Sequence, residues 1–383
     1  MARIALAVAL LAATVLPASA QFVIQSETDP DKFSMRIRGY FQFRYTFNVR
    51  DETESQEQIT NGFDNRRTKV GVAGNVLSAD TTYLVVMAVN KRTGLGFLED
   101  AWVNYEFGDT NWSVTAGQFK PPFRREELVS ASRQIAVDRS VANEVFNQDY
   151  TQGVRLAYND SQTRFQVAFT DGFRTLNDGF TNRNEADLAI TGRVEHAMGD
   201  SLRRFRDFTS WRSAEETAVL VGVAGHWQTS GHTFAAPLPA PERDQYFLTA
   251  DLSLEGQGWS AFSAVVMRTT DPDEGGEVTD FGVVAQGSLF VTDQTELFIR
   301  GSAIFPDDNH DIGGTDEFYS MTVGGTRYFI PESHAAKLVT EVIYYPEPKD
   351  DSDAIIGFRD NAGLLPDTEG NQFVIRAMMQ VMF

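Results

Sequence analysis

Hydrophobic and polar residues alternate along much of this chain, most clearly between Met35 and Asn48. One set of alternate positions is mostly apolar and the other is rich in arginine: Met35, Ile37, Gly39, Phe41, Phe43, Tyr45 and Phe47 against Arg36, Arg38, Tyr40, Gln42, Arg44 and Thr46. Strict alternation over such a length indicates a β-strand. The stretch exceeds the about 5–6 residues usual in globular sheets. It fits a tilted strand that crosses a membrane in about 9–11 residues and extends beyond it.

The same pattern recurs to the end of the chain and predicts about sixteen strands. We place them at 35–48, 65–73, 83–90, 98–107, 112–119, 153–158, 164–171, 187–196, 218–228, 245–254, 259–268, 281–290, 297–305, 318–329, 337–345 and 372–383. The links alternate between short and long, which is typical of outer-membrane barrels with short periplasmic turns and long external loops. We therefore predict an all-β fold, a transmembrane antiparallel β-barrel whose two chain ends lie on one side.

The first twenty residues have the pattern of a secretory signal peptide. Arg3 supplies the positive charge, Ile4–Leu16 is the apolar run, and Ala18–Ala20 is the small-residue cleavage site. That run is too short to span a bilayer as a helix, which takes about 20 residues. We predict a signal peptide at 1–20 and a barrel domain at 21–383, because only helices and closed barrels satisfy every backbone group in lipid.

The final strand ends on an aromatic residue. Its apolar positions share one parity: Phe373, Ile375, Ala377, Met379, Val381 and Phe383. This ending resembles the signal that the outer-membrane assembly machinery recognises. We therefore expect the outer membrane of a Gram-negative bacterium, with outer-membrane lipid, lipopolysaccharide and, through Phe383, the barrel-assembly machinery as partners.

The amino-acid composition limits the kinds of site and partner that the protein can have. The chain has no cysteine, a formal net charge of −20 and 12% aromatic residues, including 29 Phe. The missing cysteines exclude disulfides and thiolate sites, the negative charge argues against nucleic acid as a partner, and the aromatics fit membrane girdles. Acidic residues gather in the predicted loops, whereas basic residues gather on the polar faces of strands.

The link from Lys120 to Tyr150 is much longer than ordinary strand connections, whose median is about 4–6 residues. It carries Lys120, Arg124, Arg125, Arg133 and Arg139. We predict that this third external loop, 120–150, folds inward and constricts the pore.

Lumen arginines are the candidate functional residues. An arginine that faces lipid at the bilayer midplane costs about 2–4 kcal/mol, so arginines on the polar parity are expected to face the lumen. Rings of Arg and Lys favour anions, and guanidinium forks fit phosphate or carboxylate oxygens. The candidates are Lys120, Arg124, Arg133, Arg139, Arg36, Arg38, Arg44, Arg67, Lys69 and Arg155, and Arg193, Arg300 and Arg376 share the polar parity. Alternatively, such arginines pair with Glu126, Glu127 or Asp138 and only hold the loop in place. Arg327, on the apolar parity, either snorkels or marks a bulge.

Several stretches resemble the phosphate-selective porin family, the O and P type. They are IRGYFQFRY (37–45), DNRRTKVGVAGNV (64–76), LEDAWVNYEF (98–107), AGQFKPPF (116–123) and VDRSVANEVF (137–146). The resemblance implies a sixteen-stranded homotrimer whose third loop folds inward and whose eyelet is lined by basic residues, here Lys120, Arg124, Arg133 and Arg139. The acidic external loops and the absence of a dense ladder of basic residues depart from the best-studied members, so general anion preference is a firmer expectation than tight phosphate selectivity.

We therefore expect a passive channel for small anions, phosphate or polyphosphate, with no enzymatic activity and no cofactor. A general, weakly selective porin is the alternative. An outer-membrane enzyme is less well supported, because the sequence has no Gly-x-Ser-x-Gly or His-Glu-x-x-His. A soluble β-sandwich conflicts with the strand count and the terminal Phe. Asp307, Asp308 and Asp311 could hold Ca²⁺, but a solvated loop is the favoured interpretation.

Overall fold

The computed structural model describes residues 23–26, 31–51, 58–179, 186–230, 242–273, 275–310, 317–346, 361–365 and 371–383. The predicted signal peptide lies outside these residues. Within them, no helix is long and apolar enough to span a membrane.

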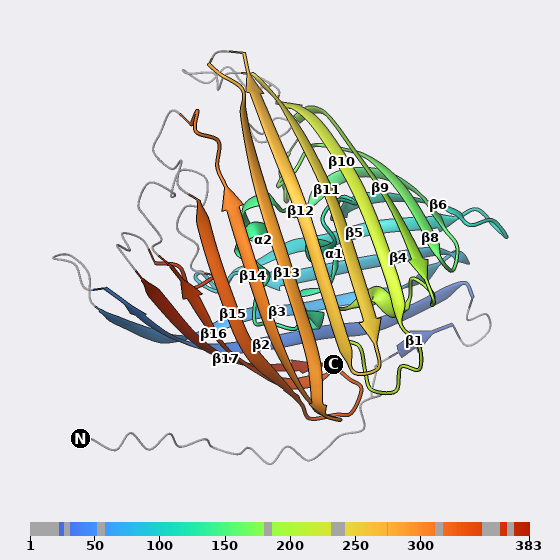
Figure 1. The fold of residues 1–383 in the computed structure, drawn as a ribbon. Coiled ribbons are helices and arrows are strands. Elements are labelled where there is room, and N and C mark those ends of the chain that lie inside the picture. Colours follow the sequence, from blue (N-terminus) through green and yellow to red (C-terminus); the bar gives the residue numbers. More distant parts are fainter. Residues whose placement is uncertain are drawn as a thin grey trace.

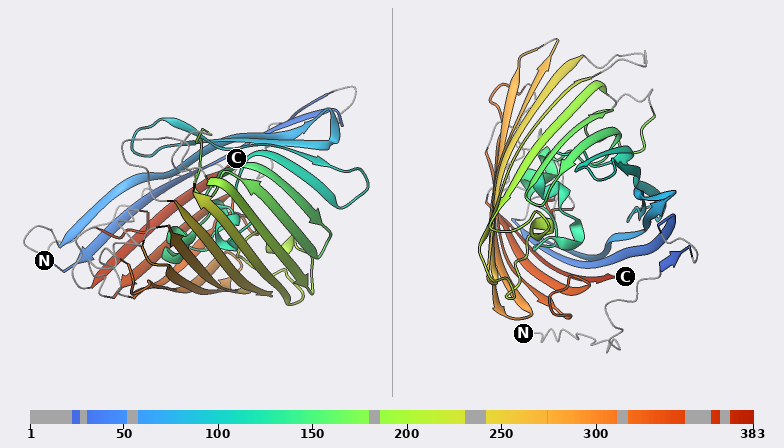
Figure 2. Two further views of the ribbon diagram at one scale, coloured as in Figure 1. Left: turned by 90° about the horizontal axis from the view of Figure 1, so that it is seen from above. Right: turned by 90° about the vertical axis from the view of Figure 1, so that its right-hand side faces the viewer.

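Sixteen antiparallel strands close into a barrel (Figures 1 and 2). They are β2 (Phe33–Arg50), β3 (Ile59–Val76), β4 (Ser78–Val89), β5 (Gly96–Glu106), β6 (Trp112–Phe119), β7 (Thr151–Asn159), β8 (Thr163–Thr170), β9 (Ala186–Met198), β10 (Ala218–Ser230), β11 (Arg243–Gly256), β12 (Trp259–Pro272), β13 (Val278–Thr292), β14 (Thr295–Phe305), β15 (Phe318–Tyr328), β16 (Ala336–Tyr345) and β17 (Gln372–Met382). Each pairs with its neighbour in sequence, and β17 pairs with β2 to complete the ring. The predicted fold class is confirmed.

Several element boundaries differ from the prediction. A short strand, β1 (Val23–Gln25), which the alternation did not reveal, pairs with the start of β2. Residues 59–62, expected in a loop, extend β3. The turn expected at Ser78–Asp80 is strand instead, because Leu77 alone, with φ 70°, reverses the chain. Many strands are longer than predicted, since polar residues continue the ladder at either end, where apolar alternation stops.

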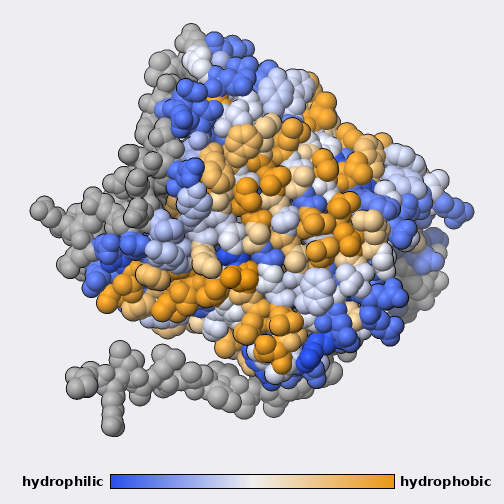
Figure 3. Space-filling model, in the orientation of Figure 1, coloured by the Kyte–Doolittle hydropathy of each residue, from blue (hydrophilic) through white to orange (hydrophobic). Residues whose placement is uncertain are grey.

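Apolar side chains cover the outside of the barrel, whereas the inside carries polar and charged side chains and one apolar region that includes Val266 and Ile304. On β2, Phe41 and Phe43 are exposed on the outer surface, whereas Gln42 and Arg44 between them are buried. Figure 3 shows the resulting hydrophobic belt between hydrophilic ends. Arg327 lies on this outer face and donates to Gln294 and Thr295 at the β13–β14 turn. Its strand has no register shift there, so it snorkels to the end of the barrel and does not mark a bulge.

Two β-bulges change the alternation. Gln42 pairs with Arg67 and Phe43 with Asn65, which leaves Arg66 as an extra residue in β3. In β5, Glu99 is extra in the same way. A bulge changes the direction in which the side chain of the inserted residue points. Arg66 therefore lies on the inner face beside Arg67, and Glu99 lies there beside Asp100.

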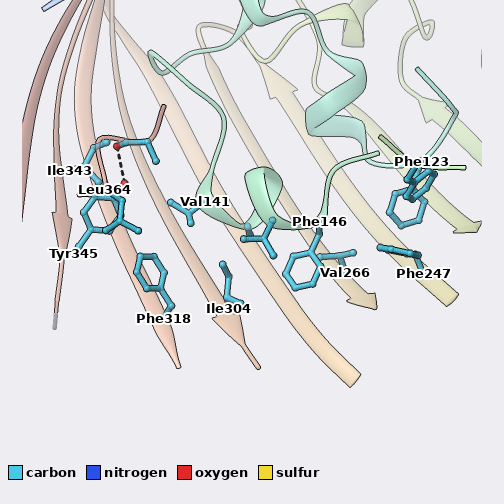
Figure 4. Close-up of a cluster of buried hydrophobic side chains, with 14 of the residues drawn as sticks. Phe123, Val141, Phe146, Phe247, Val266, Ile304, Phe318, Ile343, Tyr345 and Leu364 are labelled. Carbon is cyan, nitrogen blue, oxygen red and sulfur yellow. Dashed lines mark hydrogen bonds between the residues drawn. The ribbon is translucent and has the colours of Figure 1, made fainter. Parts of the chain in front are cut away.

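The link between β6 and β7 forms three short helices. They are α1 (Arg125–Leu128), the 3-10 helix η1 (Ala131–Arg133) and α2 (Val141–Phe146). The Ser140 hydroxyl accepts a hydrogen bond from the Asn143 amide and caps α2. Figure 4 shows Val141 and Phe146 of this helix packed among Val266 and Ile304 of the strands. Burial of these side chains stabilises the link against one wall of the barrel.

Polar contacts from the inner face fix the same link. Thr326 donates to the Ile135 carbonyl at 3.1 Å, and Lys337 donates to the Gln134 carbonyl at 2.8 Å. The Ala142 amide donates to the Ser302 hydroxyl at 3.1 Å. The link therefore rests on the inner side of β14, β15 and β16.

Candidate pore-lining site

Asp138, in the β6–β7 link, is the centre of an arginine cluster. Its carboxylate pairs with Arg67 at 2.6 Å, Arg44 at 2.7 Å, Arg66 at 2.8 Å and Arg376 at 3.1 Å. Burial alone would raise the pKa of Asp138, but these four positive charges outweigh it and hold the pKa well below its ordinary value. The carboxylate is therefore ionised at any physiological pH, and we call these five residues the Asp138 hub.

Two further carboxylates share the charge of the hub. Asp64 pairs with Arg44 at 2.8 Å, and Glu341 accepts hydrogen bonds from Arg376 and from the Val137 amide. Four guanidinium groups thus meet three carboxylates, and the hub stays net positive. The hub residues come from β2, β3, β17 and the link, so the hub fastens the link to adjacent strands at the seam where the barrel closes.

Glu127 is the centre of a second cluster in the same link. It pairs with Lys120 and with Arg139, the latter at 3.3 Å, and accepts from Asn143 at 2.8 Å. Burial would raise the pKa of Glu127, but Arg139 and Lys120 lower it to about 2. Arg139 also donates to the carbonyls of Glu126, Glu127 and Val129. Lys120 and Arg139, predicted as pore-lining residues, are thus engaged within the link.

Arg124, Lys69 and Arg155 have separate environments. Arg124 is 1% exposed, donates to the Ala142 carbonyl at 3.0 Å and lies 3.7 Å from Glu126. Lys69 pairs with Glu99, the bulged residue of β5. Arg155 donates to Thr115 at 3.2 Å and lies over the Phe119 ring.

Arg36, Arg38 and Arg133 differ from the other candidates. Arg36 and Arg38 are exposed on the inner parity of β2, and Arg133 is half-buried at the end of η1. Among the described residues none of the three has an ion pair or a hydrogen-bonded side-chain partner. Burial lowers the pKa of Arg133, Arg206 and Arg38 lower it further, and Asp207 opposes them. These cations are available to a solute.

A column of basic side chains follows the β2–β4 wall, which the sequence alone did not reveal. Strand register sets the levels: Arg36 lies opposite Ala73, Arg38 opposite Gly71, Lys69 opposite Tyr40 and Arg67 opposite Gln42. Successive levels are about 7 Å apart. At the far end a cavity of about 440 Å³ is lined by Arg66, Arg67, Lys69, Lys91 and Arg92, with Glu99.

Sequence reasoning omitted three residues of these clusters. Arg66 falls on the outward parity, and no signal in a single sequence reveals the bulge that turns it inward. Arg376 was placed on the inner parity but not among the candidates. Arg125 was noted in the link without a role, although it donates to the carbonyl of Phe205 at 2.6 Å. Groups of three or more His, Asp or Glu that could hold a metal are absent from the described residues, which do not include Asp311.

The closed sixteen-strand barrel with an apolar exterior and a charged interior is the architecture of an outer-membrane channel for small solutes. Residues 37–319 match the family described as phosphate-selective porin O and P, and the chain belongs to this family. It is therefore a porin of the Gram-negative outer membrane.

Solved porins share the fold at low sequence identity. The anion-selective porin from Comamonas acidovorans is 10% identical, with 91% of this chain and 99% of that chain covered and a TM-score of 0.60. The outer-membrane channel DcaP of Acinetobacter baumannii is 13% identical, with 94% and 99% covered and a TM-score of 0.61. OmpT of Vibrio cholerae is 10% identical, with 94% and 100% covered and a TM-score of 0.57. No curated protein matches the sequence.

Proposed function

We propose that this porin is a passive channel for small anions, with phosphate or polyphosphate as the physiological solute class. Residues 120–150 act as the constriction, and the basic column on β2 and β3 lines the wall beside them. The observation that carries the proposal is this column, because fixed cations along a narrow path lower the barrier for anions and raise it for cations. Arg36 and Arg38, which form no ion pair within the described residues, contribute most directly.

A general, weakly selective porin is the second candidate. It is favoured by the Asp138 and Glu127 clusters, in which loop carboxylates neutralise most of the nearby arginines. In that case Arg44, Arg67, Lys120 and Arg139 hold the constriction in place without selecting the solute.

Reversal potentials distinguish the two candidates. We expect the purified protein in a planar bilayer under a KCl gradient to give a reversal potential of anion-selective sign. Arg38→Glu should shift it toward cation preference, because it replaces an unpaired lumen cation with a carboxylate. Asp293→Ala, at an exposed turn, is the control that should change nothing. Cation preference of the unmodified protein would overturn the proposal without touching the fold.

We also propose a homotrimer assembled by the barrel machinery through Phe383, in a membrane of phospholipid and lipopolysaccharide. One solved form of OmpT of Vibrio cholerae is described as a trimer. The Phe383 amide and carbonyl pair with Gly39, which leaves the ring 59% exposed at the end of the barrel. Cross-linking in native membranes tests the oligomeric state.

A further inference from the structure

The link between β16 and β17 contains a buried stretch, residues 361–365, which we call the seam segment. This link (346–371) is one of the long links, which lie on the external side in barrels of this type. Ala362 and Leu364 are each 3% exposed, and Gly363 between them is buried as well. Such burial is unusual for an external loop, because loops normally run over the surface. The seam segment is therefore packed against other parts of the chain.

Inner-face side chains of β16, β17 and β2 bind the backbone carbonyls of the seam segment. The Gly363 carbonyl accepts hydrogen bonds from the amides of Asn48 and Gln372, both at 2.7 Å. The Ala362 carbonyl accepts from the Tyr345 hydroxyl at 3.0 Å, the dashed line in Figure 4. Since β17 pairs with β2 where the barrel closes, the segment lies inside the barrel along this seam.

Leu364 covers an apolar part of the inner face. Figure 4 shows its side chain beside Tyr345 and Ile343, and all three belong to one buried cluster. Gly363 lies so close to β17 that an added Cβ would be 2.7 Å from Cγ1 of Val374. Its φ of 82° is in the left-handed region that favours glycine. Because apolar side chains gain free energy when they are removed from water, these contacts give the segment a defined position on the wall.

Asn361, the first residue of the seam segment, connects it to the Asp138 hub. The Asn361 carbonyl accepts hydrogen bonds from Arg376 at 2.7 Å and from Arg44 at 2.8 Å. The same two guanidinium groups pair with Asp138 of the β6–β7 link. One pair of arginines therefore holds two links that are far apart in the sequence.

The Asn361 side chain borders the lumen beside the basic column. Its amide oxygen accepts from the Lys91 ammonium at 3.4 Å. Asn361 and Lys91 both line the cavity of about 440 Å³ at the end of that column, together with Arg66 and Arg67 of β3. The segment thus forms part of the boundary of the open space and is not only a support behind the wall.

We propose that the seam segment is a second constriction element, which narrows the external half of the lumen on the side of β16, β17 and β2. Together with the β6–β7 link it sets the single-channel conductance and limits the size of the solutes that pass. It acts through its volume, because none of its five residues, Asn-Ala-Gly-Leu-Leu, is charged. This role goes beyond the proposed anion preference and does not depend on it.

Single-channel conductance in planar bilayers tests this role. Gly363→Ala should raise the conductance, because the new Cβ strains the left-handed backbone and meets Val374, so that the ratio of displaced to docked segment rises about tenfold. Tyr345→Phe removes only the hydroxyl that binds Ala362 and should raise the conductance less. Asn361→Trp enlarges a side chain on the cavity wall and should lower it. These substitutions change no charge, so the sign of the reversal potential should stay the same.

Gly62→Ala is the matched control, since an added Cβ at this position of β3 meets no other residue within 4 Å. It should leave the conductance unchanged. Tyr345→Phe, which keeps the buried ring, decides the matter if Gly363→Ala does not fold. Unchanged conductance in Tyr345→Phe and Asn361→Trp would overturn the second constriction, as would an equal change in the control. That result would leave the anion preference standing, whereas a cation-selective reversal potential would remove the anion function and leave the constriction.

Discussion

Asp138 shows how a single carboxylate can organise a channel interior. It is 1% exposed, and four guanidinium groups lie within 3.1 Å of its oxygens. Arg300 adds a hydrogen bond to its backbone carbonyl at 2.8 Å. One residue of the β6–β7 link thus contacts strands from opposite ends of the chain, β2 and β17, at the seam where the barrel closes.

We predict that Asp138→Asn destabilises the protein by about 3–5 kcal/mol, because it leaves buried guanidinium groups without their shared counter-charge. Urea unfolding in detergent, followed by tryptophan fluorescence, measures the change. Asp293→Asn is the control, since it removes an exposed pair of little energetic value. A loss below 1 kcal/mol for Asp138→Asn would mean that Asp64 and Glu341 suffice to hold the cluster.

At the residue scale, alternation predicted the inner face of β2 but not which inner arginines stay free. Arg38 and Arg44 share one parity, yet Arg38 is exposed and Arg44 is enclosed by Asp64 and Asp138. Pairing depends on where the β6–β7 link places its carboxylates, and a single sequence carries no signal for that. Arg66 shows more clearly what a single sequence cannot predict, because the bulge that turns its side chain inward depends on how β2 pairs with β3.

Inward-folded links, not the strands, shape the interior at the scale of elements. The β6–β7 link was predicted to fold inward from its length and its charges. The alternation gave no such prediction for the link between β9 and β10 (199–217), although it holds Arg203, Arg204, Arg206 and Arg212. Its burial could not be predicted, since residues such as Asp207 and Ser210 look solvated until Thr209, His334 and Gly256 supply their partners.

Arg139 and Arg133 separate the two roles of arginine within the β6–β7 link. We expect Arg139→Gln to make single-channel currents fluctuate, because it removes three hydrogen bonds to backbone carbonyls and the pair with Glu127. Arg133→Gln should keep the current steady but reduce anion preference. Single-channel recording with reversal potentials in one gradient compares the two. Steady currents in Arg139→Gln would show that the Asp138 hub alone fixes the link.

For the whole molecule, the location of charge matters more than its sum. A chain of net charge −20 presents a basic column to its lumen, because many of its carboxylates lie in loops, and inner-face carboxylates such as Glu99, Glu195 and Asp280 pair with lumen cations. The same arrangement makes folding sensitive to acid. Buried groups that bind protons less readily than in the unfolded chain weaken the fold as pH falls.

His334, in the turn between β15 and β16, should contribute to the first stage of acid destabilisation. Burial and the charge of Lys337 lower its pKa, Asp207 opposes them, and the resulting pKa is about 4. Above the ordinary value of 6.5 the histidine is neutral in both states and costs nothing. As pH falls from 6.5 to 4 the unfolded chain takes up a proton that the folded chain does not, and stability drops by about 3 kcal/mol. Glu127, with a pKa of about 2 against 4.5, adds a second loss below pH 4.5.

Unfolding free energies between pH 8 and 3 test this assignment. His334→Gln should reduce the loss of stability between pH 6.5 and 4, because glutamine does not titrate, and leave the lower stage intact. His196→Gln, at an exposed position near the end of β9, is the control and should keep both stages. If His334→Gln kept the full loss of stability between pH 6.5 and 4, other buried groups would have to account for that loss. The contact between His334 and Asp207 of the β9–β10 link would then not be acid-sensitive.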